Sequence, residues 1–114
     1  MAFTASQHDG VLVLTTDVAE IDSGNSARVR SELLKAIGPA PKVVLDLRNL
    51  KFLDSSGLGT ILSAMRHVTS NGGELKISNV TRPVQAILEL VRFHRIVEIL
   101  DTQEDAVSTF VSES

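Results

Sequence analysis

The sequence predicts an α/β domain in which most strands of the sheet run parallel. Predicted strands alternate with amphipathic helices in the order β-β-α-β-α-β-α-β-α. Helices that connect successive strands form right-handed crossovers, and such crossovers join parallel strands. In addition, residues 43–47 (Val-Val-Leu-Asp-Leu) are almost continuously apolar, which is typical of a strand buried on both faces of a parallel sheet.

The N-terminal part of the chain predicts a hairpin followed by one helix. Residues 11–15 favour a strand, and the turn dipeptide Asp9-Gly10 separates them from a second candidate strand at 3–6. The loop at 22–25 is rich in capping residues, so we expect a helix to begin after it. Gly38-Pro39 should end that helix. Its apolar residues recur with helical spacing at Val29, Leu33 and Ile37.

The remainder of the chain predicts three more helices and two more strands. One apolar stripe has the spacing of a helix face: Leu58, Ile61, Leu62, Met65 and Val68. A strand is expected at 74–78, and Arg82-Pro83 should open the next helix because proline is tolerated in a first turn. The inward face of that helix is expected at Val84, Ile87, Leu88 and Val91. A strand at 96–100 and a helix capped by Asp101 or Thr102 complete the domain.

Length and composition describe one domain, residues 1–114, of ordinary globular type. Hydrophobic residues make up 43% of the chain and charged residues 22%, as in a typical soluble domain. The absence of cysteine excludes disulfides and thiolate metal sites, and the three histidines show no ligand spacing. The net charge of −3 argues against nucleic-acid binding. Without a signal segment or a spanning apolar run, we expect a cytoplasmic protein that does not bind membranes.

The most informative segment is Asp54-Ser55-Ser56-Gly57-Leu58-Gly59, where an apolar strand runs into a predicted helix. Hydroxyls at the start of a helix face backbone N–H groups that lack partners within the helix, and the helix dipole is positive there. Such a position tolerates added negative charge, including a phosphate. One phosphoryl group adds roughly −1.5 to −2 charges, which is a large change for this chain. The segment therefore indicates a serine that is modified rather than one that attacks a substrate.

Two other interpretations of this turn stay open. Asp54 or one of the serines could simply cap the helix, while Gly57 and Gly59 permit close packing. Against a cap alone, three capping residues stand in a row, and two glycines weaken a first turn unless another molecule has to approach closely. The other interpretation is a hydrolase with Ser55 or Ser56 as nucleophile, but the turn lacks the G-x-S-x-G pattern of a nucleophile elbow.

Two stretches, FLDSSGLGTIL at 52–62 and TRPVQAILELVRFHRIVEILDTQEDAV at 81–107, resemble the STAS domain of bacterial anti-sigma factor antagonists. The resemblance covers essentially the whole chain. It implies a STAS-type fold, in which helices cover the sheet mainly on one side and an exposed serine begins the second main helix. Relatives often carry a Thr-Gly-Leu turn after the third main helix, where this chain has Val91-Arg92-Phe93-His94. This departure leaves the identity of the partner open.

The resemblance also implies a phosphorylation switch. The unmodified antagonist binds an anti-sigma factor that is itself a serine kinase, and so frees the sigma factor. The kinase phosphorylates the antagonist with Mg-ATP that the kinase holds, and a serine phosphatase reverses the modification. The phosphorylated residue maps onto Ser56, with Ser55 as the alternative. The partner-binding residues map onto Asp22, Asn25, Asp54, Ser55, Gly57, Leu58 and Gly59.

On this basis we expect no catalytic residue, cofactor or metal on this chain, and a monomer when its partner is absent. A second role within the same fold is a subunit of another assembly, such as a stress-signalling scaffold or a lipid-transport complex. In such relatives the serine is changed or used differently. The complete Asp54-Ser55-Ser56-Gly57 core favours the switch.

Overall fold

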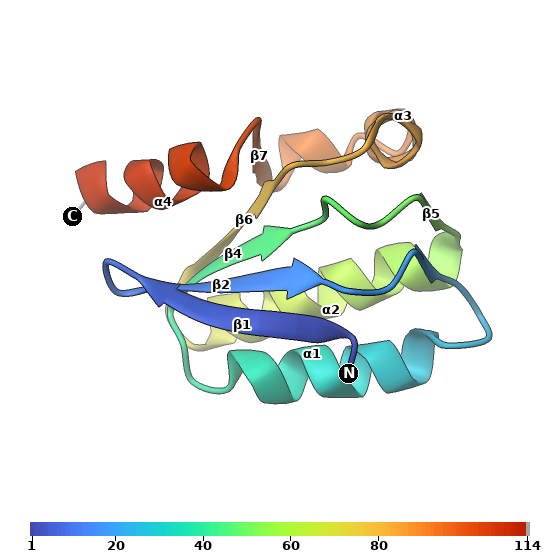
Figure 1. Ribbon diagram of the computed structural model, residues 1–114, viewed down its shortest axis with the longest axis horizontal. Coiled ribbons are helices and arrows are strands. Elements are labelled where there is room, and N and C mark those ends of the chain that lie inside the picture. Colours follow the sequence, from blue (N-terminus) through green and yellow to red (C-terminus); the bar gives the residue numbers. More distant parts are fainter. Residues whose placement is uncertain (114) are drawn as a thin grey trace.

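The computed structural model describes residues 1–113, which form a five-stranded mixed sheet flanked by helices (Figure 1). In spatial order its strands are β1 (Phe3–His8), β2 (Val11–Thr16), β4 (Lys42–Asp46), β6 (Glu74–Ser78) and β7 (Glu98–Leu100). β1 and β2 form an antiparallel hairpin, and the other neighbouring strands are parallel. The predicted α/β class with a mostly parallel sheet is confirmed.

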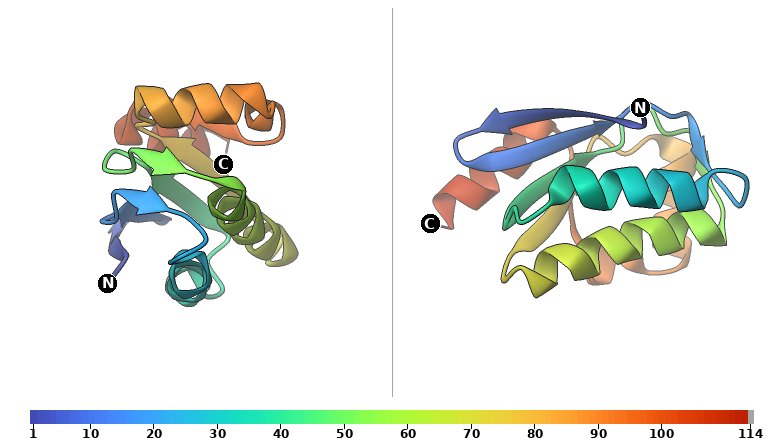
Figure 2. Two further views of the ribbon diagram at one scale, coloured as in Figure 1. Left: turned by 90° about the vertical axis from the view of Figure 1, so that its right-hand side faces the viewer. Right: turned by 90° about the horizontal axis from the view of Figure 1, so that it is seen from below.

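Three helices cover one face of this sheet and a fourth covers the other. Apolar residues of α1 (Ser26–Ile37), α2 (Ser55–Ser70) and α3 (Arg82–Leu90) share one core. Those of α4 (Gln103–Ser112) join a separate, smaller core. Seen from below, α1 and α2 lie in front of the sheet and α4 lies behind it (Figure 2). The expectation that helices lie mainly on one side is therefore confirmed.

The central strands are buried on both faces, as their apolar runs predict. In β2, Leu12 and Leu14 face the larger core while Val11 and Val13 face α4. β4 alternates in the same way, and its Val44 belongs to the core under α4. Because successive side chains of a strand point to opposite faces, a strand covered on both sides is apolar at nearly every position.

Two short strands lie outside the main sheet and were not predicted. The serine turn follows the second of them and not the strand expected at 43–47, which ends at Asp46. β3 (Glu20–Ile21) and β5 (Phe52–Leu53) pair in parallel, with Ile21 opposite Leu53. Strands of two residues are too short to show any periodicity, so sequence patterns cannot reveal them. Their pairing matters for function, because it places the loop that follows β3 beside the serine turn that follows β5.

The segment after α3 differs from the prediction. Val91, expected on the inward face, lies just beyond the helix and is 49% exposed. The chain turns at Arg92, which has a left-handed backbone conformation (φ 58°), and then forms the 3₁₀ helix η1 (Phe93–Arg95). The last strand consequently begins at Glu98 rather than at residue 96. In α4, Thr102 rather than Asp101 is the N-cap, since its hydroxyl accepts the N–H of Asp105.

Lys76 is a buried charge that ties α4 to the sheet. Its ammonium lies 2.8 Å from a Glu113 carboxylate oxygen, 3.1 Å from one of Glu98 and 4.4 Å from the centre of the Phe110 ring. Burial alone would lower the pKa of Lys76, but the hydrogen bonds to Glu113 and Glu98 outweigh burial and raise the pKa above its usual value. The buried lysine is thus charged and paired, which is the condition for holding such a group in a core.

Asp46 forms a second buried polar centre at the carboxyl end of β4. Its carboxylate accepts two hydrogen bonds from the Arg48 guanidinium, at 3.0 and 2.8 Å, and others from the side-chain amides of Asn79 and Gln103. Burial would raise the pKa of Asp46, yet the hydrogen bonds from Arg48 and Asn79 hold it below its usual value. The centre joins β4 to the end of β6 and to the start of α4.

Candidate phosphorylation and docking site

The serine turn begins α2, and Asp54 is the residue that caps this helix. One oxygen of its carboxylate, Oδ1, accepts hydrogen bonds from the backbone N–H groups of Ser56 (2.9 Å) and Gly57 (3.1 Å). These are two of the N–H groups that have no partner within a helix. Of the candidate caps that the sequence left open, the structure therefore selects the aspartate and not a serine.

Asp54 also holds the hydroxyl of Ser56. The Ser56 Oγ atom donates to Oδ1 of Asp54 over 2.5 Å, a short bond of the charge-assisted kind. The hydroxyl of Ser56 and the N–H of Gly57 hold the pKa of the Asp54 carboxyl below its usual value. The candidate phosphorylation site therefore lies directly beside a carboxylate that is negative at neutral pH.

The loop after β3 approaches this turn through Ser23, whose N–H donates to Oδ2 of Asp54 over 3.1 Å. Asp22 and Asn25 shape the loop itself. The Asn25 side chain accepts the N–H of Asp22 and donates to the Glu20 carbonyl, each over 2.9 Å. An oxygen of Asp22 accepts the N–H of Gly24 over 2.9 Å. The loop thus meets the serine turn through Ser23, which the sequence did not indicate, while the hydrogen bonds of Asp22 and Asn25 lie within the loop.

The two serines differ in their surroundings. Ser55 is exposed, and its hydroxyl forms no hydrogen bond within the part of the chain that the structure describes. Ser56 is half-buried, and its hydroxyl is oriented by Asp54. Neither serine is buried, which is a requirement for modification by another enzyme.

The two glycines of the turn have different roles. A Cβ atom on Gly57 would lie 2.5 Å from the Ile21 carbonyl oxygen and 2.7 Å from Cβ of Leu53. The close neighbour of Gly57 is thus this chain's own β3–β5 pair, and not another molecule as the sequence suggested. A Cβ on Gly59 would meet nothing within 4 Å, so Gly59 leaves bare backbone on the exposed side of α2. Leu58, between them, is half-buried against the main core.

Phe52 is a further candidate that the sequence analysis missed. It lies in β5, two residues before Asp54, and 47% of its surface is exposed. Aromatic residues are enriched among those that contribute most to binding at protein interfaces. The available signal was an aromatic residue just before the turn. From the sequence alone, however, an aromatic residue next to another apolar residue is expected in the core.

Comparison with known proteins shows that residues 2–106 match the family model described as "STAS domain". The chain belongs to the STAS domain family. It is 35% identical to the anti-sigma F factor antagonist of Paenibacillus polymyxa, over 89% of this chain and 87% of that protein. It also resembles the anti-sigma-B factor antagonist of Bacillus subtilis, with 24% identity over 77% of this chain and 81% of the relative.

Solved STAS structures share the fold. A STAS domain protein from Planctomyces limnophilus superposes with a TM-score of 0.86 at 16% identity, covering 96% of this chain and 97% of that one. SpoIIAA in its unphosphorylated form superposes with a TM-score of 0.77 at 22% identity, covering 97% of both chains. The predicted STAS-type fold is therefore confirmed.

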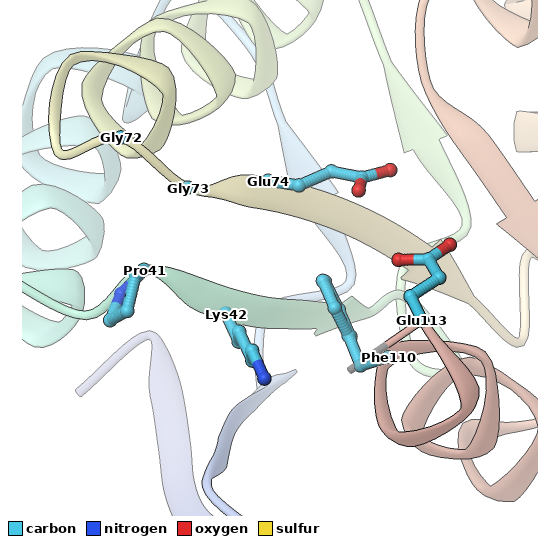
Figure 3. A pocket seen from close by; sticks show the side chains of 7 residues that line it. All are labelled: Pro41, Lys42, Gly72, Gly73, Glu74, Phe110 and Glu113. Atoms are coloured by element: carbon cyan, nitrogen blue, oxygen red, sulfur yellow. The ribbon is translucent and has the colours of Figure 1, made fainter.

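Other features of this STAS domain do not add to the site. A hollow of about 410 Å³ lies among Pro41, Lys42, Gly72, Gly73, Glu74, Phe110 and Glu113 (Figure 3). Its two glutamates bring their carboxylates to one side, and it contains none of the predicted site residues. Within residues 1–113 no group of three or more acidic or histidine side chains is placed to hold a metal ion. None of the helices described has the length and apolar character needed to cross a membrane.

Proposed function

We propose that this STAS domain is an anti-sigma factor antagonist that phosphorylation of Ser56 switches off. The unmodified form binds an anti-sigma factor serine kinase and so frees the sigma factor. The observation that carries the proposal is the Ser56 hydroxyl, which lies in the first turn of α2 and donates to Asp54 over 2.5 Å. The curated relatives named as anti-sigma factor antagonists support the same role.

The physical effect of a phosphate on Ser56 follows from its neighbours. It would add roughly −1.5 to −2 charges beside the negative Asp54 carboxylate. The N-terminus of α2 tolerates this charge within the free protein. At a packed interface, however, the phosphate would lose its hydration and would repel any carboxylate of the partner. A difference of about 3 kcal/mol corresponds to roughly a hundredfold in affinity.

Ser56 is favoured over Ser55 because its Oγ is oriented by Asp54, whereas the hydroxyl of Ser55 has no such partner. A fixed nucleophile reduces the entropy that must be lost when the phosphoryl group is transferred. SpoIIAA, one of the proteins with the same fold, is known in a phosphorylated form as well as an unphosphorylated one. A phosphate on this fold is therefore compatible with a folded domain.

In this proposal the STAS domain is not an enzyme. The kinase binds Mg-ATP and supplies the catalytic groups, and a serine phosphatase removes the phosphate from Ser56. This chain contributes the hydroxyl, the oriented turn and the surface around it: Asp22, Asn25, Asp54, Ser55, Leu58 and Gly59.

The test combines phosphorylation with binding. The purified protein is incubated with the anti-sigma factor serine kinase of the same organism and Mg-ATP, and the modified residue is mapped by mass spectrometry. We expect one phosphoryl group on Ser56, none on Ser56→Ala, and unchanged modification of Ser55→Ala. In calorimetry, Ser56→Asp should bind the kinase about a hundredfold more weakly than Ser56→Ala.

Three results would contradict the proposal in different ways. Unchanged phosphorylation of the Ser56→Ala protein would move the site to Ser55. Absence of both binding and phosphorylation would remove the antagonist role. Stoichiometric labelling by an active-site serine probe, lost in Ser56→Ala, would instead support the hydrolase interpretation.

A further inference from the structure

The turn after α3 presents a cluster of exposed apolar side chains. Leu90 is 83% exposed, Val91 49% and Ile96 57%. Phe93, within the same turn, is buried in the main core and anchors the segment. We call the exposed part, Leu90, Val91, Arg92, Arg95 and Ile96, the turn patch. Neighbouring exposed aliphatic side chains on an anchored segment are typical of an interaction surface.

The turn patch carries two arginines, on a protein whose net charge is −3. Arg92 and Arg95 are exposed, and neither forms an ion pair with any residue that the structure describes. Residues 90–97 include no acidic residue. The carboxylate just before the patch, on Glu89, accepts a hydrogen bond from Gln85. Two unpaired guanidinium groups thus flank apolar side chains, and arginine is enriched where proteins bind one another.

The conformation of Arg92 is a second sign that the patch has a function. Its φ of 58° and ψ of 31° lie in the left-handed region, directly after the end of α3. Glycine is the usual residue at this position after a helix, because any side chain is strained there. A strained residue that persists is grounds for a functional hypothesis. Here an arginine occupies the strained position, so a long cationic side chain is present where glycine would have none.

The turn patch also adjoins α2, the helix that begins at the serine turn. A cleft of about 280 Å³ is lined by Arg95 and Ile96 of the patch and by Met65 and Thr69 of α2. Glu74 and Glu98, at the starts of β6 and β7, also line it. Since a helix rises 1.5 Å per residue, Met65 lies about 15 Å along α2 from Ser55. A typical interface buries about 800 Å² on each partner. One partner can therefore cover the start of α2 and the turn patch together.

We propose that the turn patch is a second contact surface for the same partner that docks at the serine site. The partner surface that meets it carries carboxylates around exposed apolar side chains. This inference rests on the proposed function, because it assigns part of that partner's footprint. A protein partner is favoured over a polyanion, since nucleic acids and anionic membranes need a larger basic area than two arginines provide.

The experiment measures the affinity of the anti-sigma factor serine kinase of the same organism for four forms of the protein. These are the wild type, Arg95→Glu, Arg92→Gly and, as a charge reversal elsewhere, Lys35→Glu, which lies in the last turn of α1 at the end away from the loop after β3. We expect Arg95→Glu to weaken binding about tenfold or more, and this loss to shrink at high salt. Lys35→Glu should stay within about twofold of the wild type, because surface charges outside an interface have little effect.

Arg92→Gly separates docking from folding. Glycine relieves the left-handed strain, so this variant should unfold at a higher temperature than the wild type. It should nevertheless bind the kinase several-fold more weakly, because the guanidinium is gone. A loss of affinity in a protein that has become more stable cannot come from unfolding.

The possible outcomes are distinct. If the wild type does not bind the kinase, the proposed function fails and this inference falls with it. If the wild type binds and both patch variants match Lys35→Glu, the inference alone is overturned. The same holds if ultracentrifugation shows that the free protein forms a dimer that Arg95→Glu disrupts, or if the wild type binds phosphatidylserine vesicles through the patch.

Discussion

The Oγ atom of Ser56 donates to Oδ1 of Asp54 over 2.5 Å, and the same oxygen caps the first turn of α2. The proposed phosphorylation site and the helix cap are therefore one contact. Oδ2 of Asp54 also accepts the N–H of Ser23, so the contact extends to the loop after β3. A modification of Ser56 thus acts where two segments meet that lie 31 residues apart in the chain.

The capping role of Asp54 gives the first prediction. Asp54→Ala should lower the melting temperature, because the N–H groups of Ser56 and Gly57 lose their acceptor. Asp54→Asn should retain most of the stability, since asparagine is an equally good N-cap. Asp101→Ala is the control, as Thr102 and not Asp101 caps α4. Equal melting temperatures for Asp54→Ala and Asp101→Ala, measured by circular dichroism, would contradict the assignment of the cap.

The two glycines of the turn give a matched pair. Gly57→Ala should destabilise the protein by about 1–3 kcal/mol, because the added Cβ clashes with the Ile21 carbonyl and with Leu53. Gly59→Ala should stabilise it by about 0.5–1 kcal/mol, because its Cβ meets nothing and alanine is the better helix former. Urea unfolding of both variants measures the two free energies. Similar values of the same sign would refute the different roles of the two positions.

Phe52 should contribute to docking rather than to folding. Its side chain is 47% exposed beside the serine turn, so Phe52→Ala should weaken binding of the kinase by about tenfold or more. The control is Val111→Ala, which removes a side chain of similar exposure (48%) from α4, away from the site. Calorimetric titration of both variants provides the comparison. Wild-type affinity in Phe52→Ala would exclude this residue from the interface.

The buried Asp46 predicts a loss of stability in acid. Its pKa is lower in the folded protein than in the unfolded chain, owing chiefly to the Arg48 guanidinium and the Asn79 amide, which outweigh burial. The ionised carboxylate therefore stabilises the fold above the unfolded pKa of about 3.9. This contribution is lost as the pH falls below that value toward the folded pKa.

Asp46→Asn tests this pH dependence. The difference in unfolding free energy between the wild type and Asp46→Asn should be constant from about pH 6 to 7 and should shrink below about pH 4. Denaturant unfolding across this range measures it. A difference that does not change with pH would show that the charge of Asp46 has no part in the stability.

The local features of this protein were determined by the sequence itself. The stripe from Leu58 to Val68 indicates a helix, and the run from Val43 to Leu47 indicates a strand buried on both faces; both are present. Such patterns can be recognised in a sequence because the spacing of apolar residues along a helix or a strand depends only on the local chain. The motif at 54–59 likewise indicated the candidate site from a short stretch of the chain.

Tertiary structure decided what depends on contacts between distant segments. It selected Asp54 as the cap, brought Ser23 to that carboxylate, and filled the space beside Gly57 with the Ile21 carbonyl. It also buried Lys76 against the C-terminal end of α4, although a lysine in a strand is ordinarily expected to be exposed. None of these contacts leaves a trace in local periodicity, because each depends on how far-separated segments meet in the folded chain.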